Sequence, residues 1–307
     1  MASATATPGA DAQTTKSRRL LGRNPIGLVL IAPYALFLFG IYLFPLIFQL
    51  WISFFDYFFT APGVEVDRPF VGLENYTRAL TDPTFLASLR HSAIFLIINV
   101  PITVAGALVL AWALNSKIRG LTFFRTSYYV PYVTASVAVI IVWIFMFGSQ
   151  GIVNTVLGDL APDPSWLINS SWAMPMIAIF VAWKQMGYFI LLYLAALQNV
   201  PDSLYEAASV DGAGKWKQFR YVTIPGVKPA TTLVLILATI TGMNLYTEPY
   251  LLTNGGGPNG ASITPVFYIY QKGVEQGDAG FAAAMGMILL LITLLISYIQ
   301  RRYLEKD

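Results

Sequence analysis

Residues 25–55 read PIGLVLIAPYALFLFGIYLFPLIFQLWISFF, and no Asp, Glu, Lys or Arg lies between Arg23 and Asp56. A helix needs about 20 consecutive, mostly apolar residues to cross the hydrocarbon core of a bilayer. This run is long enough, so it predicts a membrane-spanning helix. A cleaved signal peptide is disfavoured, because its apolar core would be only about 7–15 residues long and would end at a small-residue cleavage site, which is absent here.

Five further stretches have the same character, so the sequence predicts six spanning helices in all. They are residues 91–116, 126–148, 171–198, 229–252 and 279–300. Only Lys184 and Glu248 interrupt them with a charge. Lipid offers no water to an open sheet edge, and the alternating pattern of a barrel strand is missing. We therefore expect an all-α membrane protein.

The composition supports this fold class. Of the 307 residues, 56% are hydrophobic and 11% are charged, whereas soluble domains are typically about 25% charged. The mean hydropathy is +0.61. These values exclude a soluble enzyme, a nucleic-acid-binding protein and a disordered scaffold as good interpretations.

Several kinds of site are also excluded. The chain has no cysteine and a single histidine, His91, which rules out a thiolate or multi-histidine metal centre. It has no G-x-x-x-x-G-K-[ST] loop, so it does not bind ATP by that route. We expect no catalytic residue, no metal site and no cofactor on this chain. His91 is expected at the start of a helix near the membrane interface.

The Lys and Arg residues predict the orientation, because they collect on the cytoplasmic side of a membrane protein. One side carries Lys16, Arg18, Arg19, Arg23, Lys117, Arg119, Arg125, Lys215, Lys217, Arg220, Lys228, Arg301, Arg302 and Lys306. The other side carries only Arg68, Arg78, Arg90 and Lys272. Both termini are therefore expected in the cytoplasm, after a disordered leader at residues 1–24 and before a short tail at 304–307.

The longest cytoplasmic loop, residues 199–228, contains VPDSLYEAASVDGAGKWKQFRYVTIP at residues 200–225. Ser203 and Glu206 have the spacing of a capping box, which predicts a helix start. Gly212 is suited to end that helix, because glycine readily adopts a left-handed terminating conformation. A second short amphipathic helix should follow and stop at Pro225. Such an elbow with a face of small residues is suited to close docking against another protein.

This loop resembles the signature loop of the permease subunits of bacterial ABC importers. That signature is Glu-Ala-Ala, three residues, Gly, nine residues and Ile-x-Leu-Pro, and Val222-Thr223-Ile224-Pro225 is a conservative variant of its end. Residues 71–76, VGLENY, and 252–258, LTNGGGP, resemble the carbohydrate branch of the family. The resemblance covers roughly residues 25–303. It is closest to the maltose-type and glycerol-3-phosphate-type permeases, and within these to the subunit that pairs with a non-identical permease.

The resemblance implies a type I importer permease of the bacterial cytoplasmic (inner) membrane, forming half of a pathway for a sugar or polyol derivative. It implies four kinds of partner: a second permease, two ATP-binding cassette subunits that bind the ATP and Mg, an extracytoplasmic solute-binding protein, and the carbohydrate-like substrate. The external loops 56–90, 149–169 and 253–278 would dock the binding protein. The residues expected to couple to the ATPase are Ser203, Glu206, Ala207, Ala208, Asp211, Gly212, Ile224 and Pro225.

Lys184 and Glu248 need an explanation, because a charge at the centre of a span costs about 2.5–3.5 kcal/mol. Aromatic and amide side chains near them suit sugar recognition. The predicted substrate-pathway residues are Lys184, Gln185, Tyr188, Asn244, Tyr246 and Glu248. Alternatively, the two charges snorkel to water or meet the partner subunit. Two other interpretations stay open: an ion-coupled secondary carrier that uses this pair, and a non-transporting assembly or channel protein.

Overall fold

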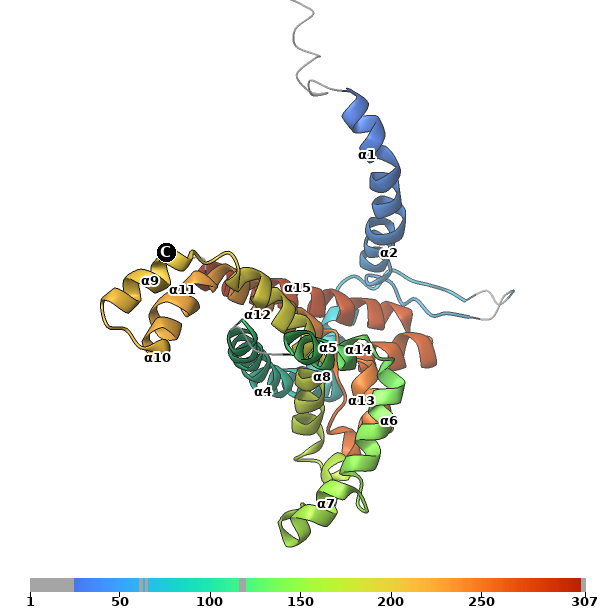
Figure 1. The fold of residues 1–307 in the computed structure, drawn as a ribbon. Helices are drawn as coiled ribbons and strands as arrows, with labels where there is room; N and C mark the ends of the chain where they lie inside the picture. The colour runs from blue at the N-terminus through green and yellow to red at the C-terminus, as the bar shows by residue number, and fades with distance from the viewer. Residues whose placement is uncertain (1–24, 61–62, 64–65, 116–119, 305–307) are drawn as a thin grey trace, which may run out of the picture. The chain divides into compact units, whose positions relative to one another are not determined.

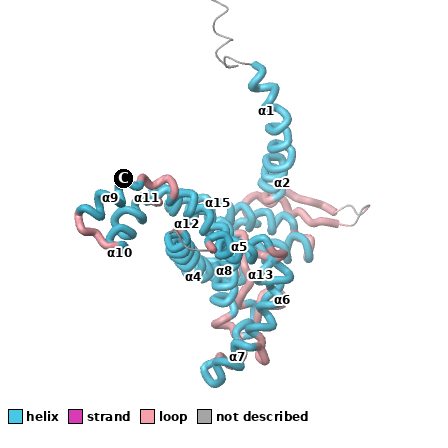
Figure 2. The backbone as a smooth tube through the Cα atoms, in the orientation of Figure 1, coloured by secondary structure: helices cyan, strands magenta, loops and turns pink. Residues whose placement is uncertain are grey.

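A computed structural model describes residues 25–60, 63, 66–115 and 120–304. These residues form helices and irregular segments, and no strand occurs among them (Figure 2). Their only sheet-like pairings are isolated bridges that join Phe55 to Phe70 and Phe58 to Asp278. The all-α class predicted from the sequence is confirmed for the described residues. The predicted leader at 1–24 and residues 305–307 of the predicted tail lie outside them.

The chain divides into two compact units, residues 1–51 and 52–307, and each is described by itself. The described part of the first unit contains α1 (Pro25–Leu38), a π turn at Phe39–Leu43 and most of α2 (Phe44–Ile52). The Phe44 N–H donates to the carbonyl of Phe39, five residues back. The hydrogen-bond register therefore changes directly before Pro45, which has no N–H to donate.

The second unit holds the remaining helices (Figure 1). They are α3 (Glu74–Thr81), α4 (Pro83–Leu114), α5 (Leu121–Val133), α6 (Ser136–Phe147), α7 (Ile152–Leu157), α8 (Ala173–Leu197), α9 (Asp202–Val210), α10 (Lys215–Gln218), α11 (Ile224–Gly226), α12 (Lys228–Met243), α13 (Thr247–Leu252), α14 (Pro265–Tyr270) and α15 (Ala279–Leu304).

Five described helical segments are long and apolar enough to cross a membrane. They are Val29–Ile52, Pro83–Leu114, Ser136–Leu160, Ala173–Leu197 and Ala279–Leu304. A sixth is obtained when Lys215–Gly226 and Lys228–Met243, which meet at a bend of 69°, are counted as one. The structure thus agrees with a chain of five or six apolar spans. The side on which the termini lie stays a prediction.

Two of the stretches predicted as single spans are interrupted. Within 126–148, Thr134 and Ala135 adopt extended angles that separate α5 from α6. Within 229–252, residues Asn244–Tyr246 separate α12 from α13. A break at membrane depth needs partners for the freed backbone groups. The Thr264 hydroxyl supplies one of them by donating to the buried carbonyl of Leu245 at 2.5 Å.

The second unit is built around α4 and α8, which pack along each other (Figure 1). α5 crosses α8 so closely at Gly187 that a Cβ there would lie 2.1 Å from the carbonyl oxygen of Tyr128. The core between α4, α8 and α12 includes Tyr193 and Val234. This packing holds in place the two breaks and the loop between α8 and α12.

Candidate functional site

The loop between α8 and α12 forms a folded elbow that we call the coupling segment, Asp202–Gly226. Its first helix, α9, ends at Gly212, where φ is +75°. The Gly212 N–H donates to Ser209 O at 3.1 Å, and the Ala213 N–H donates to Ala208 O at 2.8 Å. These two bonds are the Schellman motif, which satisfies the last carbonyls of a helix. The sequence prediction that Gly212 ends the helix is therefore confirmed.

Three contacts hold the second half of the coupling segment against the first and against the bundle. The Gln218 amide donates to the Ser209 hydroxyl at 2.8 Å and to the carbonyl of Ala213 at 3.1 Å. The hydroxyls of Tyr205 and Thr223 are 3.0 Å apart. Phe219 is buried, with its ring centroid 4.8 Å from that of Trp112 on α4. The elbow is therefore preformed in this chain alone.

The residues predicted to couple to the ATPase lie mostly on the surface of this elbow. Ser203, Glu206, Ala207, Asp211, Gly212 and Pro225 are exposed, and Ala208 and Ile224 are half-buried. Large apolar side chains are also exposed on this surface: Val210 is 87% exposed and Trp216 is 69% exposed. Apolar side chains that protrude from a folded elbow are typical of a surface that a partner covers.

Two local predictions for this loop are wrong. The Ser203–Glu206 capping box is absent, because α9 already begins at Asp202, after Pro201, and no side chain caps its start. Pro225 does not stop the second helix, which continues to Gly226. A π turn at Phe219–Thr223 precedes Pro225, and the Ile224 N–H bonds to Phe219 O. As at Pro45, the change of register lets the helical run pass through a proline.

Lys184 and Glu248, which are far apart in the sequence, form an ion pair in the structure. Lys184 Nζ lies 3.6 Å from Glu248 Oε1, and the two side chains are only 12% and 14% exposed. Lys184 also donates to the Ser136 hydroxyl. The pair thus joins the middle of α8 to the starts of α6 and α13. Pairing offsets part of the cost of burying each charge.

The other predicted pathway residues lie within four positions of Lys184 or Glu248 in the sequence and have different environments. Tyr188, one turn along α8, stacks on Tyr132 of α5 at 5.1 Å between centroids. Tyr246 stacks on Tyr250 at 5.6 Å. The amide of Asn244 is exposed and bonds back to Ile240 O, while Gln185 is half-buried on α8. The structure therefore provides a paired charge, and stacked aromatic pairs on the same two chain segments, one turn further along α8 and directly before α13.

Sequence reasoning missed Ser136, Tyr132 and Tyr270, whose ring centroid is 5.1 Å from that of Tyr246. Ser136 meets Lys184 because a new helix begins there. No periodicity in the sequence shows that break. Pro131, five residues earlier, was the only available signal that the helix is irregular.

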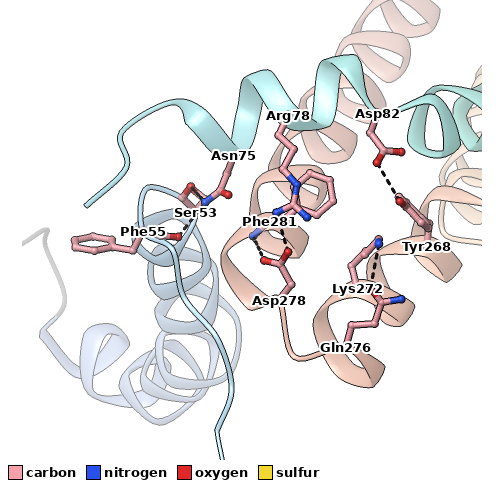
Figure 3. Close-up of polar contacts among 10 residues, drawn as sticks. All are labelled: Ser53, Phe55, Asn75, Arg78, Asp82, Tyr268, Lys272, Gln276, Asp278 and Phe281. Carbon is pink, nitrogen blue, oxygen red and sulfur yellow. Dashed lines mark hydrogen bonds and ion pairs between the residues drawn. The ribbon is translucent and has the colours of Figure 1, made fainter. Parts of the chain in front are cut away.

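The 71–76 signature fastens the chain segment around Ser53 to α3 (Figure 3). The Asn75 amide donates to the carbonyls of Ser53 at 3.1 Å and of Phe55 at 2.9 Å. The hydroxyls of Tyr76 and Ser53 are 2.7 Å apart. On the same helix, Arg78 pairs with Asp278 at 2.8 Å and lies over the ring of Phe281 (Figure 3).

The 252–258 signature makes a tight loop after α13. Asn254 and Gly255–Gly257 all have positive φ. A Cβ at Gly256 would lie 2.6 Å from the side chain of Ile263, so glycine is needed there for space as well as for conformation. The hydroxyls of Thr253 and Ser262, 2.7 Å apart, close the loop. The predicted external loop therefore has a defined shape.

Comparison with known proteins identifies the family of the chain. Residues 103–306 match the family model described as the binding-protein-dependent transport system inner membrane component. The chain is 34% identical over 295 residues to the arabinooligosaccharides transport system permease protein AraP of Halalkalibacterium halodurans, covering 94% of this chain and 91% of that protein. It is also 34% identical over 294 residues to the lactose transport system permease protein LacF of Rhizobium radiobacter, covering 93% and 97%.

A solved structure has a similar fold. It is a bacterial alginate ABC transporter in complex with an alginate pentasaccharide-bound periplasmic protein, and the similarity covers 94% of this chain and 96% of that chain. The TM-score is 0.74 at 20% sequence identity. This likeness confirms the predicted importer-permease fold.

Proposed function

Because the chain belongs to the family of binding-protein-dependent transport system inner membrane components, we propose that it carries a sugar or polyol derivative through half of a translocation pathway. It is a transport subunit of the bacterial inner membrane. The sugar assignment is supported by relatives named for arabinooligosaccharide and lactose transport and by the aromatic faces around Lys184 and Glu248. Aromatic rings and hydrogen-bonding groups suit sugar rings and hydroxyls.

The observation that carries the proposal is the preformed, exposed coupling segment. In the complete importer, α9 would lie in a cleft of an ATP-binding cassette subunit, with Glu206 against a basic side chain and Val210 covered. Two such subunits would bind ATP and Mg, while this chain would bind no cofactor and catalyse no reaction. Closure of the ATPases would then move α9 and, through Phe219 and Trp112, α4.

A second, non-identical permease would complete the pathway, and an extracytoplasmic solute-binding protein would deliver the substrate. The loops near the two signatures, which have fixed shapes, are suited to receive that protein. Because selectivity would reside largely in the binding protein, the pathway itself needs few polar contacts. Lys184, Gln185, Tyr188, Asn244, Tyr246 and Glu248 are the proposed lining.

The ion-coupled carrier interpretation finds no support in the family assignment. The geometry also explains why Lys184 and Glu248 are tolerated within apolar helices without a role in ion coupling, because each neutralises the charge of the other. A carrier would have no use for the folded elbow between α8 and α12.

The test is transport by the complete importer in proteoliposomes. We expect uptake to require ATP and the loaded binding protein and to be unaffected by an uncoupler. Glu206→Lys should abolish stimulation of the ATPase by the loaded binding protein. Arg302→Glu, an equal reversal of charge at an exposed site outside both the coupling segment and the external loops, should leave stimulation intact. Uptake without ATP, or full stimulation in Glu206→Lys, would contradict the proposal.

A further inference from the structure

A cavity of about 710 Å³ lies between the start of α4, the start of α8 and the loop that ends at Ile263. It is remote from the coupling segment. Ile94, which lines the cavity on α4, and Trp112, which contacts the coupling segment, are separated by about 27 Å of helix. The polar residues that line this cavity are Thr84, Arg90, His91, Ser170, Ser171 and Asn259.

The cavity carries an unbalanced positive charge. Arg90 is exposed, and within the described part of the chain it has neither an ion pair nor a hydrogen bond. No Asp or Glu is among the described residues that line the cavity. By contrast, Arg78, twelve residues earlier, is paired with Asp278. Arg90 is therefore available to an external anion.

The walls of the cavity are preformed. His91 is 8% exposed, and its Nδ1 donates to the carbonyl of Ile263 at 3.0 Å. A carbonyl oxygen only accepts, so this bond places the hydrogen on Nδ1 and ties the loop to α4. The hydroxyls of Thr253 and Ser262 brace the same loop. The site is therefore already shaped before an anion binds, and binding requires little ordering of the loop.

An exposed apolar strip continues from Arg90 toward the middle of α4. Ile94 and Ile97 lie four and seven residues further on, which places them on the same helix face as Arg90. They are 37% and 73% exposed. A charged group beside an apolar strip, at the end of a membrane-spanning helix, is the arrangement that an amphiphile requires.

We propose that the Arg90 cavity binds a phospholipid. The lipid phosphate lies on the Arg90 guanidinium and the hydroxyls of Ser170 and Ser171, and one acyl chain follows Ile94 and Ile97. An anionic phospholipid is preferred, because Arg90 is not neutralised by the chain itself. A sugar is a poorer fit, since no Phe, Tyr or Trp lines the described cavity to stack on its ring.

The experiment uses the purified importer complex and native mass spectrometry, with dioleoylphosphatidylglycerol titrated as the probe. The variants are Arg90→Gln, Arg90→Lys and, as a matched control, Arg68→Gln, which removes another exposed cation outside the cavity. Arg90→Gln should weaken retention of the lipid about five- to tenfold. Arg90→Lys should keep most of it, and Arg68→Gln should keep all of it.

Three outcomes overturn the proposal. Equal retention in wild type and Arg90→Gln would show that Arg90 does not hold the lipid. Displacement of the lipid by millimolar inorganic phosphate alone would make the site one for a free anion. Unchanged lipid retention with weaker docking of the binding protein in Arg90→Gln would assign Arg90 to that protein. Because lipid retention is measured without transport, the result is independent of the proposed function.

Discussion

The coupling segment and the Lys184–Glu248 pair are both polar features of an apolar chain, yet they are built in opposite ways. The coupling segment gathers its hydrogen bonds from within 25 consecutive residues, Asp202–Gly226, and exposes its working surface. The ion pair joins residues 64 positions apart and is largely buried. A local motif can be recognised from spacing, whereas a long-range pair depends on how the helices cross. The two should therefore respond differently to substitution.

The largest effect is expected where one member of the buried pair is removed. Lys184→Met leaves the buried Glu248 carboxylate without its counter-charge, and Glu248→Gln does the same to the Lys184 ammonium. Loss of one partner of a buried pair costs about 3–5 kcal/mol. The double variant Lys184→Met/Glu248→Gln should recover most of that loss. Thermal unfolding of the purified complex would measure it, with Lys217→Met, at an exposed position, as the control.

Equal stability of the single variants and the wild type would mean that water solvates the pair. The pair would then not be a buried contact that stabilises the fold, in contrast to the exposed coupling segment. If the double variant is stable but fails to transport, the pair contributes to the pathway as well as to the fold.

A smaller effect is expected at the helix crossing beside the pair. Gly187→Ala would place a methyl group 2.1 Å from a backbone oxygen of α5, which forces the helices apart and costs about 1–3 kcal/mol. Gly106→Ala is the matched control, because its methyl group would meet only the flexible end of Met186, at 2.9 Å. Unfolding temperatures should fall for Gly187→Ala and change little for Gly106→Ala. Similar values for both would show that α5 can shift without cost.

The third effect concerns the coupling segment. Gly212→Ala puts a Cβ into a left-handed conformation with φ of +75° and should cost about 1 kcal/mol. Gly214→Ala is the control, because Gly214 has φ of −67° and, like Gly212, open space around it. Stimulation of the ATPase by the loaded binding protein should drop in Gly212→Ala and persist in Gly214→Ala. Gly212→Asn should be intermediate, because asparagine tolerates this conformation better than alanine.

The parts of the molecule that depend on neighbouring residues were predictable. Charge-free runs predicted apolar helices, and Gly212 predicted the end of α9 because only a glycine or asparagine readily closes a helix in that way. Even so, the predicted Ser203–Glu206 capping box is absent. Pro201 and Asp202 start α9 without a side-chain cap, and a match to the spacing of a capping box does not show whether its hydrogen bonds form.

The parts that depend on helix crossings were only partly predictable. Lys184 and Glu248 could be paired on energetic grounds, because two buried charges of opposite sign favour each other. Ser136 could not be added to them, since its role follows from the break at Thr134 and Ala135. Pro225 was misjudged for a related reason. The π turn before Pro225 contains Phe219, which packs against Trp112 more than 100 residues away, and the spacing of residues within the loop does not show that contact.

The smallest effect is expected at Gln218, whose amide joins the two halves of the coupling segment. Gln218→Ala removes two hydrogen bonds that water can largely replace, so together they contribute only about 0.5 kcal/mol, the low end of the range for a single bond, and it leaves the Phe219 contact in place. Hydrogen exchange of the α9 amides should accelerate about threefold, with no change in the unfolding temperature of the complex. Lys217→Ala, at an exposed neighbouring position, is the control. Unchanged exchange in Gln218→Ala would mean that Phe219 and the Tyr205–Thr223 contact alone fix the elbow, and that its shape depends on the bundle as the ion pair does.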